Sequence, residues 1–393
     1  MTSSPAVRFL LVPFALSTLS APVGAQHDVA PDDERRHPVE TRLPASGTTA
    51  IMDLTLGKPI VAATMNGRGP YRFYLDTGAA GTVLDRALFD ELGITALGEG
   101  AIGDPANPHA IPVVYGRIDS VRFGEATFAG VPCAAMDRAA LGGADAPRGV
   151  LGFPLFADVL LTLDYPNRQV RLSRGELPPA DGARIVEYRT PDGIPEVPLR
   201  AGGRVVWAHL DTGSPGGLMF PDAFRDSLAL ASEPLEVGRA RTVNSEMAIF
   251  AAKLDGDVQI GTRTYEKPEV RFNSVLPAIN LGYEYLREFA FTFDQAHNRL
   301  LFEPGPRLPP QKRYGIRLGS APDRFDIAGV EPGSPADLAG LLAGDRVIAV
   351  NGTPIGELSL EKRSAAMRAP HVTLEIARGD ETLSVPMSLE DGK

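Results

Sequence analysis

One acidic turn occurs twice in this chain of 393 residues, and the repetition strongly constrains the fold. The sequence reads FYLDTGAAG at 73–81 and HLDTGSPGG at 209–217, so the two Asp-Thr-Gly tripeptides start at Asp76 and Asp211. Asp, Thr and Gly are common turn residues, and a single copy carries little information. Two copies in matching contexts predict that one structural unit has been duplicated.

A second pair of segments supports the duplication. LGFPLFADVLLTLDYPNRQVRL at 151–172 aligns with LGYEYLREFAFTFDQAHNRLLF at 281–302, in the same order as the two acidic turns. We therefore predict two copies of one lobe, lobe 1 at 51–176 and lobe 2 at 184–305. Short apolar runs alternate with Gly, Pro and Asp turns throughout both, which predicts a mainly β fold.

Two acidic turns in one molecule predict a pair of carboxyl groups that work together. Carboxylates about 3 Å apart cannot both ionise cheaply, so they share one proton. One of them can then take a proton from a water molecule while the other protonates the carbonyl oxygen under attack, and the roles reverse to expel the amine. This chemistry needs no metal, cofactor or covalent intermediate, and we expect none.

The residues around each aspartate suit such a turn. Gly78 and Gly213 allow a sharp change of direction and offer backbone amides to the carboxylates. Thr77 and Thr212 can hydrogen-bond to the opposite turn across a two-fold axis. The later segments GVLG (149–152) and INLG (279–282) can run beneath the two turns.

The two turns differ at the residue after the tripeptide, which is Ala79 in lobe 1 and Ser214 in lobe 2. A hydroxyl group here can donate to the charged carboxylate and favour its ionised form. We therefore predict that Ser214 makes the pair asymmetric, and that the pKa values of the pair lie higher than they would with two hydroxyl groups.

Residues 51–305 resemble the aspartic peptidases of the retropepsin and pepsin kind, with both lobes fused in one chain. The resemblance rests on both Asp-Thr-Gly turns and both later glycine segments. It implies that Asp76 and Asp211 are the catalytic pair and that the substrates are polypeptides. Asn280 departs from the family pattern, which has an apolar residue there, so we expect lobe 2 to pack differently at this point.

The resemblance also implies a hairpin flap over the cleft. The candidates are GEGAIGDPANPHAIP (98–112) in lobe 1 and GRARTVNSEMAIF (238–250) in lobe 2. Both can equally be plain surface loops, and the two interpretations stay open. Tyr115 lies just beyond the first candidate, and we expect it to be a strand residue.

The C-terminal part has a different character. A proline-rich linker at 306–313 is followed by a small α+β domain at 314–393, which resembles a PDZ domain. The resemblance implies that Tyr314, Gly315 and Ile316 form the loop that receives the carboxylate of a C-terminal peptide, which is bound by strand addition. The alternative is a packing domain without a ligand.

The N-terminal part resembles a secretory signal. Residues 1–25 combine an early arginine, a short apolar stretch and small residues, which predicts a cleaved signal peptide and an exported protein, periplasmic or secreted. An uncleaved membrane anchor is the alternative, but the apolar run is short and broken. We expect 26–50 to form a flexible leader. Cys133 is the single cysteine, and we expect it in the core.

Other functions find less support in the sequence. The net charge of −10 and the lack of a basic patch argue against a nucleic-acid partner. The six histidines show no metal-ligand spacing, and no G-x-S-x-G motif surrounds a serine. A carboxylate pair can also cleave glycosides. We expect a monomeric aspartic endopeptidase; the main alternative is an inactive peptide-binding scaffold that uses the PDZ domain.

Overall fold

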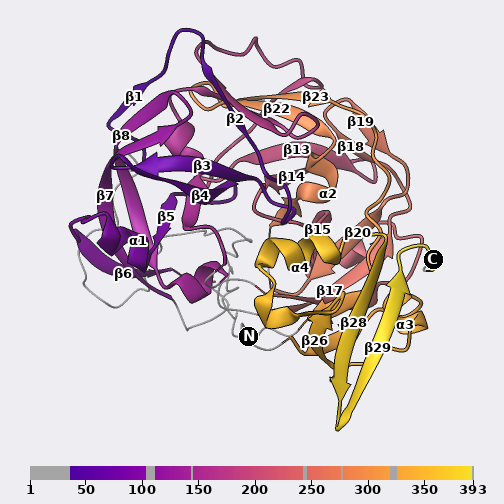
Figure 1. Ribbon diagram of the computed structural model, residues 1–393. Helices are drawn as coiled ribbons and strands as arrows, with labels where there is room; N and C mark the ends of the chain where they lie inside the picture. The colour runs from indigo at the N-terminus through magenta and orange to yellow at the C-terminus, as the bar shows by residue number, and fades with distance from the viewer. Residues whose placement is uncertain are drawn as a thin grey trace, which may run out of the picture.

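The computed structural model describes residues 36–102, 111–142, 145–241, 246–275, 278–318 and 325–391, without the side chains of 238–247. The predicted signal peptide at 1–25 and the first part of the predicted leader lie outside the described residues. The fold is mainly β, as predicted, and the C-terminal domain lies beside the two lobes (Figure 1).

Lobe 1 is built on one sheet of eight strands. In spatial order these are β1 (Glu40–Arg42), β8 (Ala126–Met136), β5 (Thr82–Asp85), β9 (Gly149–Gly152), β4 (Arg68–Asp76), β3 (Ile60–Met65), β7 (Ile111–Phe123) and β6 (Gly98–Ile102). Three short helical segments accompany the sheet: α1 (Arg86–Glu91), η2 (Arg138–Leu141) and η3 (Phe153–Phe156). Tyr115 lies in β7, so its assignment to a strand is confirmed.

Lobe 2 repeats this plan with nine strands. Their order is β16 (Leu235–Arg241), β17 (Glu246–Lys253), β20 (Glu269–Asn273), β15 (Leu218–Pro221), β21 (Ile279–Leu281), β14 (Arg204–Leu210), β13 (Glu196–Ala201), β18 (Val258–Ile260) and β19 (Arg263–Tyr265), with η4 (Asp222–Ser227) and α2 (Tyr283–Leu286). The parallel pair β4–β9 corresponds to β14–β21, and the parallel pair β5–β8 to β15–β20. The duplication seen in the sequence is therefore a duplication of sheet topology.

A third sheet joins the lobes. It contains β12 (Ile185–Glu187), β23 (Arg299–Pro304), β22 (Phe289–Asp294), β10 (Leu160–Asp164), β11 (Gln169–Ser173) and β2 (Thr48–Ile51). Its centre is the antiparallel pair β10–β22, where Thr162 opposes Thr292 and their hydroxyl oxygens lie 2.8 Å apart. These two threonines are equivalent in the sequence repeat, so the join has local two-fold symmetry.

Strands β1 and β2 correct one expectation. The sequence predicted a flexible leader at 26–50, and for the described residues 36–50 this is wrong. Strand β1 pairs with β8 of lobe 1, and β2 pairs with β11 of the joining sheet. The polar side chains that suggested a leader lie on edge strands, where backbone hydrogen bonds to a neighbouring strand outweigh composition.

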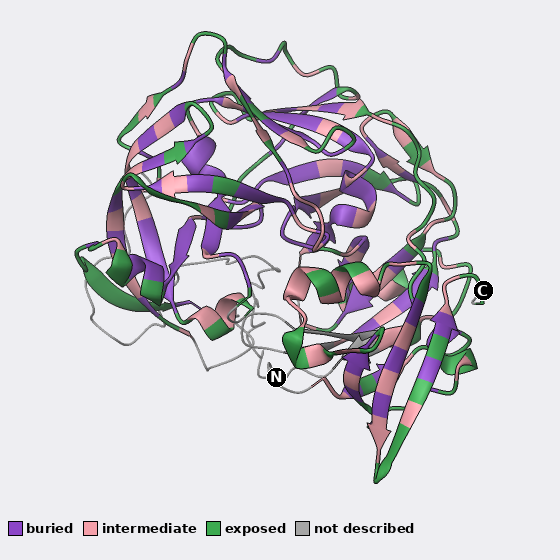
Figure 2. Ribbon diagram, viewed as in Figure 1, coloured by how far each residue is buried: buried purple, intermediate pink, exposed green. Residues whose placement is uncertain are grey.

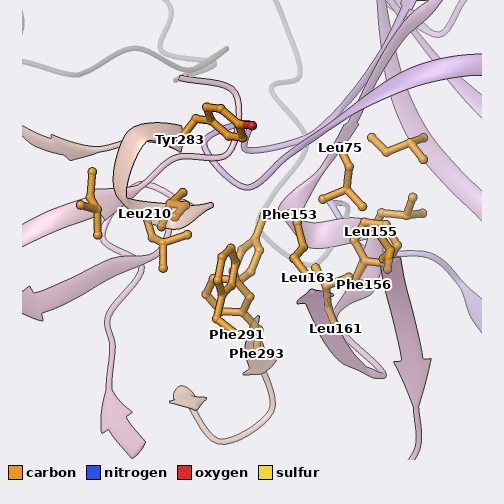
Figure 3. Packing of buried hydrophobic residues seen from close by; sticks show 14 of the residues in the cluster. Leu75, Phe153, Leu155, Phe156, Leu161, Leu163, Leu210, Tyr283, Phe291 and Phe293 are labelled. Atoms are coloured by element: carbon orange, nitrogen blue, oxygen red, sulfur yellow. The ribbon is translucent and has the colours of Figure 1, made fainter. Parts of the chain in front are cut away.

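The apolar core runs through both lobes without a break. Figure 2 shows buried residues concentrated in the strands, with exposed residues in the outer turns. At the junction Phe153 packs edge-on against Phe293, with ring centroids 4.9 Å apart, and Figure 3 shows Phe291 beside them. Burying one phenylalanine side chain contributes about 1.5–3 kcal/mol, so this cluster holds the lobes together. Cys133 is buried, as predicted, and burial raises the pKa of its thiol to about 12.

The C-terminal domain has its own apolar core. Its elements are β24 (Ile316–Leu318), β25 (Ile327–Val330), α3 (Pro335–Leu338), β26 (Arg346–Val350), β27 (Thr353–Pro354), η5 (Ile355–Glu357), α4 (Leu360–Ala366), β28 (His371–Arg378) and β29 (Glu381–Ser388). Within the described ranges, the helices are all too short or too polar to cross a bilayer.

The predicted linker at 306–313 forms no helix or strand. Its residues are nevertheless attached to lobe 2. The guanidinium of Arg307 donates to the carbonyl of Thr264, and the amide of Leu308 donates to Glu288. The linker therefore runs along the surface of lobe 2 instead of standing free of it.

Candidate active site

The two acidic turns face each other where the lobes meet. Asp76 is the last residue of β4, and Asp211 directly follows β14, its equivalent in lobe 2. The backbone of Gly213 lies against the Asp76 carboxyl so closely that a Cβ at 213 would be 2.2 Å from Oδ2 of Asp76. The carboxyl groups of Asp76 and Asp211 are close enough for each to influence the pKa of the other. The structure thus brings together the two residues that the sequence singled out.

Reciprocal hydrogen bonds join the turns. The hydroxyl of Thr77 donates to the carbonyl of Leu210 (2.5 Å), and the hydroxyl of Thr212 donates to the carbonyl of Leu75 (2.8 Å). In return the amide of each threonine donates to the other hydroxyl, at 2.9 Å for Thr77 and 3.1 Å for Thr212. Both threonines are fully buried. The cross-lobe bonds expected from the sequence are present, and they fix the spacing of the two aspartates.

The glycine segments lie beneath the turns, as expected. Gly152 pairs with Asp76 in the β4–β9 register, and a Cβ on Gly152 would be 2.2 Å from the carbonyl oxygen of Gly81. In lobe 2 a Cβ on Gly282 would be 2.7 Å from the carbonyl oxygen of Gly216. Only glycine allows the two backbones to approach so closely.

Burial dominates the electrostatics of the pair. It raises the pKa of Asp76, and it raises the pKa of Asp211 well above the ordinary value, with the charge of Asp76 as the next contribution. Several groups oppose this rise, Lys58 and the amide of Gly78 among them. The charge of Lys58 lowers the pKa of both carboxyls, and the amide of Gly78 donates to Oδ1 of Asp76 at 2.8 Å. The arrangement favours one shared proton over two full charges.

Lys58 was missed by the sequence analysis. It sits in the turn before β3, next to Pro59, whose carbonyl accepts the amide of Leu75 directly before Asp76. Its ammonium lies over the ring of Tyr74, 5.4 Å from the centroid. A lone lysine between strands gives no sequence signal, because only the β3–β4 pairing places it near the aspartates.

Asn280 was noted in the sequence only as a departure from a pattern. It is buried in β21, and its side-chain amide donates to Oδ2 of Asp211 at 2.8 Å. The backbone pairs as in lobe 1, since Asn280 pairs with His209 in the same register in which Val150 pairs with Tyr74, but Val150 lies in an apolar cluster whereas Asn280 bonds to Asp211. The difference lies in side-chain chemistry.

Ser214 does not have the predicted contact. Its hydroxyl accepts a hydrogen bond from the amide of Gly216 at 3.4 Å, and within the described residues it makes no hydrogen bond to a carboxylate. The predicted source of asymmetry is therefore wrong. The sharp turn directs the Ser214 side chain back along its own loop, and Asn280 occupies the position beside Asp211.

Two parts of the chain match models of known protein families. Residues 61–155 match the family model described as aspartyl protease, and residues 327–378 match that of a PDZ domain. The chain is therefore similar to an aspartyl protease domain over residues 61–155 and to a PDZ domain over residues 327–378. No curated protein sequence shows significant similarity to it. Among solved structures it is similar to the aspartic proteinase from Irpex lacteus, at 12% identity and a TM-score of 0.43, over 66% of this chain and 97% of that chain.

Both candidate flaps of the protease domain are arms of β-hairpins. Strand β6 pairs with β7, and β16 pairs with β17, while the connecting residues 103–110 and 242–245 lie outside the described residues. The loop end of the paired strands in lobe 1 lies near the first acidic turn, because Ile102, the last residue of β6, and Val113 share a buried cluster with Ala79. This places the end of β6, and not its start at Gly98, on the side of the first acidic turn.

The predicted carboxylate loop of the PDZ domain is assembled, but its tyrosine points inward. Tyr314 is buried in the domain core, where its hydroxyl donates to the carbonyl of Ala369 (2.7 Å). Gly315 has φ of +74° and lies so close to Ser334 that a Cβ would be 2.3 Å away. Ile316 starts β24, which pairs on one side with β25. Tyr314 therefore supports the loop from behind, and only backbone groups of Gly315 and Ile316 remain for a peptide terminus.

The remaining candidates have structural roles. The imidazole of His209 lies 3.0 Å from Glu196, inside the β13–β14 pair, which agrees with the structural role expected for a histidine two residues before Asp211. Across the described part of the chain, no cluster of three or more His, Cys, Asp or Glu could hold a metal ion.

Proposed function

We propose that this protein is an aspartic endopeptidase in which Asp76, Asp211 and a water molecule hydrolyse peptide bonds. One observation carries the proposal: a partly buried carboxyl, Asp76, and a buried one, Asp211, face each other on turns that are hydrogen-bonded to one another through Thr77 and Thr212. The carboxylate of the pair removes a proton from the water, which attacks the peptide carbonyl carbon. The carboxyl protonates the carbonyl oxygen, and a second proton transfer releases the amine.

The surrounding groups support this chemistry. The threonine bonds hold the spacing, so that no reorganisation is needed when the transition state forms. The backbone amide of Gly78 stabilises the charged form of Asp76. Lys58 partly offsets the effect of burial, which keeps the singly charged pair available. No cofactor takes part in any of these steps.

The PDZ domain contacts lobe 1 through helix α4. The hydroxyl of Ser364 donates to the carbonyl of Thr55 (2.9 Å), and the guanidinium of Arg368 donates to the same carbonyl (2.6 Å). Glu361 forms a salt bridge with Arg72 (2.6 Å). Helix α4 thus rests on the turn that leads to Lys58 and β3 (Figure 1).

This turn also reaches lobe 2. A Cβ on Gly57 would be 2.9 Å from the Arg368 guanidinium and 3.6 Å from Pro215, which follows Ser214. We therefore assign the PDZ domain to recognition of substrate C-termini or to regulation of the adjacent site. PDZ domains bind a peptide as an added strand, and β24 offers an unpaired edge in the described structure.

The alternative is an inactive scaffold that presents the PDZ domain to peptides. In a scaffold, two facing carboxyls would cost folding free energy, because burial opposes their ionisation, and they would contribute nothing to peptide binding by the PDZ domain. Both aspartates and all four cross-lobe threonine hydrogen bonds are present, which favours activity. We also propose that the protein acts as a monomer and is exported to a periplasmic or extracellular space, as the 1–25 segment indicates; cell fractionation tests the latter.

The test of activity uses residues 26–393 incubated with casein from acidic to neutral pH. Asp76→Asn and Asp211→Asn should each lose roughly 10²–10⁴-fold in rate, because both carboxyls move protons in the reaction. Asp255→Asn, which changes an exposed carboxyl paired with Lys267, should retain wild-type activity. Absence of cleavage by the wild type, together with peptide binding to the PDZ domain, would favour the scaffold.

A further inference from the structure

The two lobes differ at one buried position beside the paired carboxyls. Val150 in β9 and Asn280 in β21 occupy the same register position of the duplicated sheets, opposite Tyr74 and His209 respectively. Both side chains are only 4% exposed. Lobe 1 therefore has an apolar side chain where lobe 2 has an amide, although backbone and burial are alike.

The amide of Asn280 comes at a cost to stability. Its Oδ1 is buried and has no protein hydrogen-bond partner. Burying an unsatisfied polar atom costs free energy, whereas a valine, as in lobe 1, would bury no polar atom. Among the described residues, the Asn280 side chain hydrogen-bonds to Asp211, from Nδ2 to Oδ2, so the benefit of the amide comes through that carboxyl.

An N–H donor stabilises a carboxylate more than a carboxylic acid. The Asn280 amide accordingly lowers the pKa of Asp211, against burial and the charge of Asp76, which raise it. The other titratable groups that act on the pair are Lys58, which also favours ionisation, and Tyr165, a buried phenol in the turn directly after β10. His209 lies in β14, two residues before Asp211, but its ring is engaged by Glu196.

We propose that Asn280 is a positioning residue of the catalytic pair, which holds Oδ2 of Asp211 and keeps the pair singly charged to more acidic pH than its burial alone would allow. Lobe 2 thereby supplies a side-chain donor that lobe 1 lacks. The inference rests on the proposed function, because it assigns Asn280 to the same carboxyls.

The test compares the full chain with Asn280→Leu, which keeps the shape and removes the donor. The acid limb of the kcat/KM profile should move up by about one pH unit, the size expected when a hydrogen bond to a charged group is lost. KM should change little, because Asn280 is buried beneath the pair. Asn273→Leu is the matched control: it removes a second buried amide of lobe 2, one that bonds to the carbonyl of Phe220, and should lower Tm without moving the limb.

A second measurement does not depend on turnover. Carbon-13 NMR of labelled aspartate carboxyls should show that the lower pKa of the pair rises in Asn280→Leu and stays in place in Asn273→Leu. An unchanged pKa would overturn the proposal, and a lowered pKa would show that Asn280 accepts from protonated Asp211, which also overturns it. If the wild type titrates as expected but cleaves no peptide, the proposed function fails while the role of Asn280 in the pair stands.

Discussion

Thr77 and Thr212 exchange hydrogen bonds across the junction of the lobes, and each also donates to the carbonyl that precedes the opposite aspartate. Each threonine therefore holds the strand end of the other lobe. Since both are fully buried, the loss of either hydroxyl leaves an amide and a carbonyl without their partner.

Thr77→Val should accordingly lower the free energy of unfolding by about 1–3 kcal/mol, the cost of a buried group left unsatisfied. It should also reduce kcat, because the spacing of Asp76 and Asp211 loosens. Thr162→Val is the control: it breaks the hydroxyl pair with Thr292 in the joining sheet, and should lower stability with little effect on kcat. Urea unfolding and peptide assays check both, and equal losses of kcat in the two variants would contradict the account.

Gly213→Ala should abolish activity. A Cβ at 213 would lie 2.2 Å from Oδ2 of Asp76, so either the turn or the carboxyl must shift. Gly81→Ala, in the loop after the first turn, meets no atom within 4 Å and should leave activity near the wild-type level. Active Gly213→Ala protein with an unchanged Tm would show that the two turns are not so close.

Buried Asp211 should make the protein less stable as pH rises. Burial raises the pKa of Asp211 above its value in the unfolded chain, so between the two values the folded state binds more protons. This contribution to stability is present below the unfolded pKa and is lost as pH rises through the folded pKa. Asp211→Asn should therefore be more stable than the wild type at neutral pH, and the advantage should disappear in acid. Urea midpoints measured across pH test this, and an advantage that grows in acid would contradict it.

The contacts between helix α4 and lobe 1 should affect KM for protein substrates. In a Ser364→Ala/Arg368→Ala double variant, the PDZ domain loses its hydrogen bonds to the turn at Thr55. KM for proteins with a suitable C-terminal tail should rise, while kcat on short peptides should be spared. Lys362→Ala on the same helix is the control. A loss of kcat on short peptides would indicate instead that α4 supports the active turns.

Much of the fold follows from the repeat. Two matching acidic turns predicted the duplicated sheets, the cross-lobe threonine bonds and the close glycine contacts, because these depend on backbone geometry that short motifs encode. Strands β1 and β2 could not be predicted, since their partners β8 and β11 are distant in sequence.

The direction in which a side chain points could not be predicted from the sequence either. Ser214 and Asn280 both carry donors near Asp211, and only the fold shows that Asn280 reaches it. Helix α4 contacts Thr55 although the two are more than 300 positions apart in the sequence, and no local sequence pattern predicts this contact.

The central claim is that Asp76 and Asp211 of one chain form the catalytic pair. A mixing experiment tests this claim most directly. Asp76→Asn and Asp211→Asn proteins are combined under conditions that permit subunit exchange, and casein hydrolysis is compared with that of the wild type. If the pair forms within one chain, each molecule retains one defective half, and the account predicts that the mixture stays inactive while the wild type cleaves. Recovery of activity in the mixture would mean that intact pairs form between chains, and would contradict the account.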